Sequence, residues 1–146
     1  MKTFAFLGHP LCMRHSRGFP RMVCVTLIPK ERSHLLRERI ERLCQIGRTG
    51  QSLHHLLRGL NWLLRGWSAL YHHAWGAKRV FGSLDHYAWW GVFRWPRRKH
   101  QHTSVKRLKA LCPPSKEPGT RRGQRHHQGV TLFVAGRTQV EPYRLA

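Results

Sequence analysis

The sequence LHHLLRGLNWLLRGWSALYHHAW, from Leu53 to Trp75, decides the fold. At about 100° per residue its apolar side chains fall on one helical arc of about 140°. They are Leu53, Leu56, Leu57, Leu60, Leu63, Leu64, Trp67, Leu70, Tyr71, Ala74 and Trp75. Ser52 precedes the stretch and belongs to the preferred N-cap residues. The pattern therefore predicts an amphipathic helix that begins after Ser52, ends near Trp75 and buries one face.

The opposite arc of this helix is cationic. It carries His54, His55, Arg58, Asn61, Trp62, Arg65, His72 and His73. The stretch contains no acidic residue, so ion pairs within it cannot explain its arginines. Arg58 and Arg65 are seven residues apart and lie one above the other. Such a ridge suits the phosphates of a structured RNA, and an ordinary solvated helix face is the alternative.

Three further helices are expected around this one. The first runs from Glu31 to Ile46 after Pro29, and its buried face is expected to hold Leu35, Leu36, Ile40, Leu43 and Ile46. The third runs from Ser83 to Trp95 and is apolar nearly all round, which is typical of a helix buried from more than one side. Gly76 and Gly82 bracket the connection before it, and Pro96 ends or kinks it. A short fourth helix is expected from Val105 to Leu111.

Short strands are expected at both ends of the chain. The N-terminal candidates are Phe4–Gly8 and Arg21–Pro29. They are expected to be either a strand pair with a long connection that contains Pro10 or two strands of a larger sheet. Residues 112–129 are rich in Pro, Gly and charge and predict a flexible basic linker. Val130–Val134 is a last strand candidate. The predicted fold is therefore mainly α, a small bundle of about three to four helices with short flanking β-strands at the N- and C-terminal ends.

The composition excludes several classes of function. The 146 residues include 27 Lys and Arg against 6 Asp and Glu, a net charge of +21 that attracts polyanions. Asp85 is the sole aspartate, which excludes chemistry built on paired aspartates. No apolar run reaches the ~20 residues of a membrane span. The histidine pairs lack a matching ligand at metal-site spacing, so neither a metal nor a cofactor is predicted.

The four cysteines, Cys12, Cys24, Cys44 and Cys112, form no CxxC pair. Spread in this way they suit free thiols in a reducing compartment, and a cytoplasmic location is expected.

Two blocks of sequence resemble a known family. LNWLLRGWSALYHH, Leu60–His73, resembles the L-N-x-x-x-R-G-W-x-x-Y-Y signature of the group II intron maturase-specific domain, also called domain X or thumb. FGSLDHYAWWGVFRWPRRKH, Phe81–His100, resembles the block that follows in that family. The resemblance spans residues 4–109. It departs at His72, where the signature has a second Tyr, and after Leu111, where the match is poor.

The resemblance implies a division of the chain. FLG, Phe6–Gly8, resembles the end of the reverse-transcriptase palm, so residues 1–30 would be a palm remnant that forms a strand pair. Residues 31–111 would be the helical thumb and maturase-specific domain, 112–129 the linker and 130–146 a strand-like end. The motif residues that this assigns to structure are Leu60, Asn61, Gly66, Trp67, Tyr71, Phe81, Leu84, Asp85 and Trp95.

The function implied is that of an RNA-binding maturase fragment. It would contact group II intron RNA and assist splicing, and it would not be an enzyme, because the catalytic Asp motif of the palm is absent. A separate reverse-transcriptase palm fragment is a further expected partner, and the oligomeric state stays open. The residues expected to contact RNA are Arg58, Trp62, Arg65, His72, Arg97, Arg98, Lys99, Lys106, Arg107 and Lys109.

Several of these residues are given specific expected roles. Trp67 and Tyr71 lie on the apolar arc and are expected in the core. Trp62 stands among cations and is expected either to stack on a base or to pack against the palm that this chain lacks.

Three motif residues are expected to act within the fold. Gly66 is expected to permit close helix approach, and Asn61 to hydrogen-bond a neighbouring loop. Asp85 is expected in the first turn of the third helix, where a carboxylate is favourable to the helix dipole.

Two alternatives remain from the sequence. A basic amphipathic helix with leucine and tryptophan opposite arginine and histidine is also typical of membrane-active proteins. The apolar third helix argues against that function, because it needs a protein core. The chain could also be the non-functional remnant of a decayed intron-encoded reverse-transcriptase gene, which the sequence does not exclude.

Overall fold

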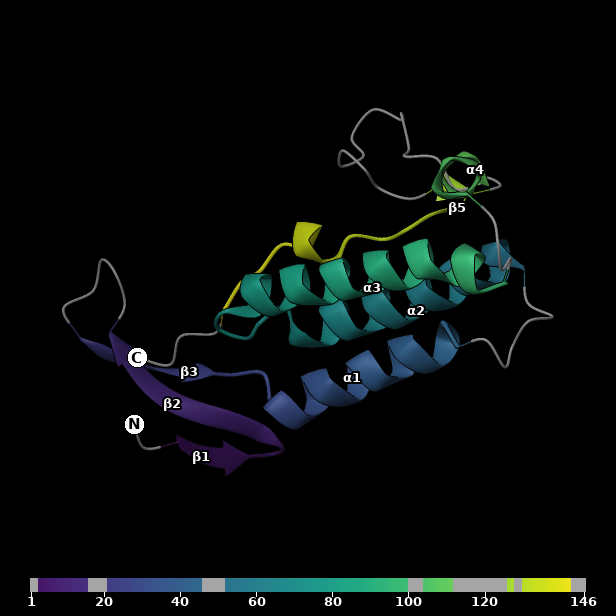
Figure 1. Ribbon diagram of the computed structural model, residues 1–146. Coiled ribbons are helices and arrows are strands. Elements are labelled where there is room, and N and C mark those ends of the chain that lie inside the picture. The colour runs from purple at the N-terminus through teal and green to yellow at the C-terminus, as the bar shows by residue number, and fades with distance from the viewer. Residues whose placement is uncertain are drawn as a thin grey trace.

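The computed structural model describes residues 3–15, 21–45, 52–99, 104–111, 126–127 and 130–142, and it confirms the mainly α fold. The N-terminal strands are β1 (Thr3–Phe6), β2 (His9–His15) and β3 (Met22–Thr26). The helices are α1 (Lys30–Leu43), α2 (Leu53–Tyr71), α3 (Ala77–Lys99) and α4 (Val105–Leu111). The chain continues through β4 (His126–His127), β5 (Val130–Thr131) and the 3-10 helix η2 (Ala135–Arg137). Figure 1 shows α1, α2 and α3 side by side, with the three-stranded sheet at one end of them.

Helix α2 is the centre of the bundle, and its apolar arc is buried as expected. The Ser52 hydroxyl accepts a hydrogen bond from the His55 amide at 3.3 Å, which confirms the N-cap. Leu57 and Leu60 are fully buried against α1 and α3. Each such leucine contributes about 1.5–3 kcal/mol relative to an exposed one. The helix ends at Tyr71 rather than near Trp75, because the chain turns there toward α3.

Helix α3 is longer than predicted at both ends. It runs from Ala77 to Lys99. It contains Gly82, which was expected in the connection before it, and Pro96, which was expected to end or kink it. Residues 72–76 make the connection from α2, and Gly76 within it has φ of +73°, a conformation that favours glycine. Pro96 lies in the last turn of the helix, so the backbone hydrogen bonds that it disrupts are close to the helix end. Its ring is buried. The predicted burial from more than one side is confirmed, since α1, α2 and η2 all pack on α3.

Helix α1 packs against both α2 and α3. Leu36 and Ile40 are buried as predicted, whereas Leu35 is 48% exposed. The helix ends at Leu43, and Ile46, its predicted end, lies outside the described residues. Close approach to α3 occurs where the Cys44 side chain faces Gly91. A Cβ atom at Gly91 would lie 2.8 Å from the Cys44 Sγ atom, so only glycine fits without movement.

The N-terminal sheet contains a strand that the sequence did not predict. Strand β2 occupies the expected connection and pairs antiparallel with both β1 and β3. Pro10 misled the prediction, yet it lies at the start of β2. The Pro10 carbonyl accepts a hydrogen bond from the Leu27 amide at 2.8 Å. Proline has no backbone N–H group, and at this position that group would point beyond the end of β3. The sheet joins the bundle through the Trp75 amide, which donates to the Thr26 carbonyl at 2.8 Å.

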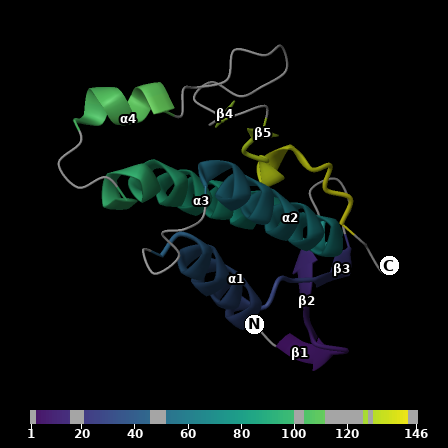
Figure 2. The same ribbon diagram turned by 90° about the vertical axis from the view of Figure 1, so that its right-hand side faces the viewer.

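The C-terminal segment is a strap and not a strand over its predicted length. We name residues 130–142 the C-terminal strap. Only Val130–Thr131 is β-strand, paired with His126–His127, and the chain then extends to η2. Most of the predicted linker 112–129 lies outside the described residues. Figure 2 shows the strap on the side of α2 and α3 that faces away from α1.

The close contact at Gly91 predicts opposite effects for two glycine substitutions. Gly91→Ala forces the Cys44 side chain and α1 to shift, and overpacking of this kind costs about 1–3 kcal/mol, more than the ~1 kcal/mol gained in helix propensity. Gly66→Ala is the matched control, because nothing lies within 4 Å of its added Cβ. We expect Gly91→Ala to lower the free energy of unfolding in urea and Gly66→Ala to raise it slightly. Equal changes of the unfolding free energy in both variants would contradict the close approach of Cys44 to Gly91.

Candidate nucleic-acid interface

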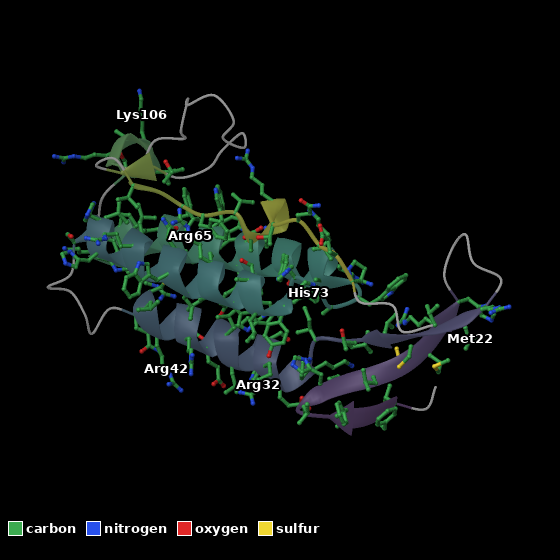
Figure 3. All side chains as sticks on the ribbon, turned by 180° about the vertical axis from the view of Figure 1, so that it is seen from behind. Met22, Arg32, Arg42, Arg65, His73 and Lys106 are labelled. Carbon is green, nitrogen blue, oxygen red and sulfur yellow. The ribbon has the colours of Figure 1, made fainter. Side chains whose placement is uncertain are left out.

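The solvent-facing side of α2 presents one aromatic ring between two guanidinium groups. Arg58, Trp62 and Arg65 are spaced four and three residues apart, so they are neighbours on one helix face. All three are exposed, and Trp62 is 80% exposed, the most of any tryptophan in the chain. We name these three residues the α2 ridge. Figure 3 labels Arg65 beside the strap.

Asn61 does not belong to the cationic surface, contrary to the sequence prediction. Its side chain is 8% exposed and lies under the C-terminal strap. The amide nitrogen Nδ2 donates to the Thr131 carbonyl at 2.8 Å, and the oxygen Oδ1 accepts from the Phe133 amide at 2.7 Å. These bonds satisfy backbone groups of the strap some 70 residues further along the chain. The expected hydrogen bond to a neighbouring segment is thereby confirmed.

Asp85 is the second anchor of the strap, and its predicted place was wrong. Because α3 begins at Ala77, Asp85 lies in the third turn and not in the first, so it does not act on the start of the helix dipole. Its carboxylate oxygens accept from the Ala135 amide at 2.7 Å and the Gly136 amide at 2.8 Å. The carboxylate therefore caps the first backbone N–H groups of η2.

Arg65 links the strap to the ridge. Its guanidinium carbon lies 5.2 Å from the centroid of the Phe133 ring, within cation–π range. This contact orients the side chain, while the planar group retains N–H donors for a phosphate. The ridge is thus bounded on one side by the strap.

A groove bounds the ridge on its other side, between α1 and α2. Its volume is about 460 Å³. It is lined by Arg39, Arg42, Leu43, Gly59, Trp62 and Leu63. The two arginines of α1 were not predicted to belong to the site, because arginines near glutamates suggest ion pairs. Arg42 does approach the Glu38 carboxylate, at 3.9 Å, but both its side chain and that of Arg39 remain exposed. Figure 3 shows Arg42 pointing away from the bundle.

A second cationic cluster lies at the far end of α3. Arg97, Arg98 and Lys99 are exposed in the last turn, where positive charge is favourable to the helix dipole. Lys106 and Arg107 are exposed on α4, which contacts α3. Lys109 belongs to the same short helix, and its side chain lies outside the described residues. Figure 2 shows α4 near this end of α3, so the structure brings these residues of α3 and α4 together. They form a cluster separate from the α2 ridge.

His72 is separated from the ridge that it was expected to join. It is the C-cap of α2, seven residues after Arg65, the nearest residue of the ridge, which is about 10 Å along the helix axis. Its ring is partly buried, contacts the Ala69 carbonyl through Nδ1 and packs on His73. The His72 carbonyl accepts a bond from the Glu141 amide at 3.1 Å, so this residue holds the end of the strap.

The remaining motif residues form the core, with one exception. Leu60, Phe81, Leu84, Tyr71 and Trp95 are all buried. Trp67 is half-buried, with its ring 4.5 Å from that of Tyr71 and 6.0 Å from that of Phe81, which joins two parts of the core. The exception is Gly66, whose expected close helix approach is wrong, because its Cα is exposed with open space around it.

The described residues offer no assembled catalytic group. Burial raises the pKa of the Cys44 thiol to about 11, so this cysteine stays protonated and unreactive at neutral pH. No three His, Cys, Asp or Glu side chains within the described ranges lie close enough together to hold a metal ion. In the same part of the chain, no helix combines the length and the apolarity that crossing a bilayer requires.

These features define a basic α-helical module whose C-terminal strap is fastened by one asparagine and one aspartate. Residues 34–111 match the family model described as group II intron, maturase-specific domain. The match covers 78 of the 146 residues, and the chain therefore belongs to this family. A search of curated proteins finds no match to the chain. The family is a maturase domain and not a catalytic polymerase domain, and membership indicates a role in group II intron splicing.

The anchoring role of Asp85 predicts a local effect on the strap. Asp85→Ala leaves the Ala135 and Gly136 amides without their carboxylate acceptor. Hydrogen bonds to charged groups contribute about 1.5–3 kcal/mol, so we expect the free energy of unfolding to fall by about 2 kcal/mol. Hydrogen exchange at these two amides should become faster. Glu31→Ala removes the same charge from the exposed first turn of α1, where loss of a carboxylate costs about 0.3–1 kcal/mol, and it should leave the exchange of these two amides unchanged. Unchanged exchange in Asp85→Ala would refute the anchor.

Proposed function

We propose that this chain binds group II intron RNA and assists its splicing, without polymerase activity of its own. The observation that carries the proposal is the exposed Trp62 ring with Arg58 and Arg65 beside it on α2 and Arg39 and Arg42 across the groove on α1. Guanidinium groups bind phosphates bidentately, and an exposed aromatic ring offers a base a stacking surface. A helix that only faced water would gain nothing from an exposed tryptophan.

The second cationic cluster extends the proposed contact. Arg97, Arg98, Lys99, Lys106 and Arg107 are exposed at one end of the bundle. Together with the α2 ridge they allow one structured RNA to be held at two places. The net charge of +21 draws RNA to the chain over distances set by the ionic strength.

The acidic residues of the chain support the proposed lack of polymerase activity. Two-metal phosphoryl transfer needs carboxylates that converge on the metal ions. Asp85 is the only aspartate in the sequence, and its carboxylate binds backbone amides of the strap. We therefore assign this chain an accessory role in splicing and no catalytic step.

The N-terminal sheet supports a protein partner for the proposed fragment. Phe4 is 62% exposed and Phe6 is 59% exposed on the edge strand β1. Exposed aromatic side chains on an open sheet edge favour pairing with another chain. We assign residues 1–30 to the end of a reverse-transcriptase palm, so a separate palm fragment is the proposed partner. The free thiols of Cys12, Cys24 and Cys44 support a cytoplasmic setting.

The membrane-active alternative finds less support. An interfacial helix must turn its apolar face to lipid. In this fold Leu56, Leu57, Leu60 and Leu64 of α2 are at most 1% exposed and are packed against other helices. A lipid surface could reach them only after the bundle opened. The exposed side of the same helix carries guanidinium groups, which favour a polyanion.

The proposed RNA contact predicts a steep dependence of affinity on salt. If the chain neutralises six to ten phosphates, the slope of log affinity against log salt should be roughly −5 to −9. Arg58→Gln combined with Arg65→Gln should make the slope shallower by about one to two, one per lost contact. Titration of a structured intron RNA at several salt concentrations measures both quantities.

A charge-matched control distinguishes the ridge from general electrostatics. Arg32→Gln combined with Arg79→Gln removes the same charge from exposed positions outside the ridge and groove. Its slope should stay near that of the parent. A parent slope near zero would overturn RNA binding. Equal effects of the two double variants would show that the ridge is an ordinary solvated helix face and makes no specific contact with RNA.

A further inference from the structure

The groove beside Trp62 has a geometry that the proposed function does not by itself require. We propose that this groove between α1 and α2 is a binding site for one unpaired RNA base. The base stacks on the Trp62 indole, and Arg39 and Arg42 bind the phosphates that flank it. The proposal rests on the proposed RNA binding and specifies which feature of the RNA is recognised.

The surroundings of Trp62 leave one side of its ring open. On a helix surface its neighbours are the residues three and four positions away. On one side these are Arg58 and Arg65, and on the other they are Gly59 and Gly66. Gly59 lines the groove, and nothing lies within 4 Å of a Cβ built at Gly66. Neither glycine places a side chain beside the indole on the groove side, and the Leu43 side chain, 3.8 Å from a Cβ built at Gly59, lines the groove there.

The groove has the size and chemistry of a site for a small planar group. Its volume of about 460 Å³ lies in the range of about 300–1,000 Å³ that is usual for ligand pockets. Leu43 and Leu63 line its apolar part, and they suit the face and edge of a base. Arg39 and Arg42 line its rim from α1 and are exposed, where they can reach a backbone phosphate.

The occupant follows from the charge and from the shape of RNA. The surroundings of Trp62 are charged. Guanidinium groups border it from both helices, and the Glu38 carboxylate lies 3.9 Å from the Arg42 guanidinium. A protein partner with an apolar surface would have to desolvate these charges without compensation. RNA brings compensating phosphates. Bases inside a duplex are already stacked and paired, so only a bulged, looped or terminal base can enter the groove.

Two hairpin RNAs that differ by a single unpaired adenine test the site. The parent chain should bind the bulged hairpin more tightly than the fully paired one, by about 5- to 100-fold, which is the range expected for stacking of one base on an aromatic ring. Trp62→Ala should lose this preference and bind the paired hairpin as the parent does. Trp62→Phe keeps an aromatic face and should retain part of the preference. Fluorescence anisotropy with labelled hairpins measures the affinity of each of the three proteins for both RNAs.

Matched controls make the outcome specific. Leu70→Ala truncates a side chain that is 64% exposed on the same helix but outside the groove, and it should keep the full preference. Arg39→Gln combined with Arg42→Gln should weaken the bulged hairpin more than the paired one. A preference that survives Trp62→Ala, or equal losses on both RNAs, would overturn the base site and leave RNA binding standing. A parent chain that binds neither hairpin would overturn both proposals.

Discussion

Burial of the apolar arc of α2 is the constraint on which the other elements depend. Leu57 and Leu60 are completely enclosed, and α1, α3 and the C-terminal strap are the elements that enclose them. Because the core-facing side of the helix is fixed in this way, the opposite side can present charge without loss of stability. The arrangement leaves Arg58, Trp62 and Arg65 in solvent on a rigid element, which is a favourable support for a binding surface.

The strap gives two polar residues of the family's motif blocks a structural role. Asn61 and Asp85 lie on different helices, and each hydrogen-bonds two backbone groups of the strap. Backbone groups that pack against a helix pair need partners, and these side chains supply them. The strap in turn contacts Arg65 through Phe133 and so limits where that guanidinium can point. Motif residues of the core, the strap and the proposed RNA surface are therefore physically connected.

Sequence periodicity predicted the fold well where the signal was local, and it failed where the partner was distant. The apolar arc and the Ser52 cap of α2 were confirmed because they depend on residues within a few turns. Strand β2 and the full length of α3 were missed, since Pro10, Gly82 and Pro96 were given more weight than the packing around them. Asp85 was misplaced because Gly82 was taken to precede the helix, and its role was missed because its backbone partners lie 50 residues further along the chain.

The candidate site was predictable in part for the same reason. The ridge follows from spacing along one helix, and the groove requires two helices to be docked. The division of α2 into a core side and a binding side is tested most directly by the six tryptophan indole N–H signals in an NMR titration with intron RNA. We predict that the Trp62 signal shifts while the signal of Trp67, on the core side of the same helix, stays in place. A shift of Trp67 with an unmoved Trp62 would contradict this division of the helix.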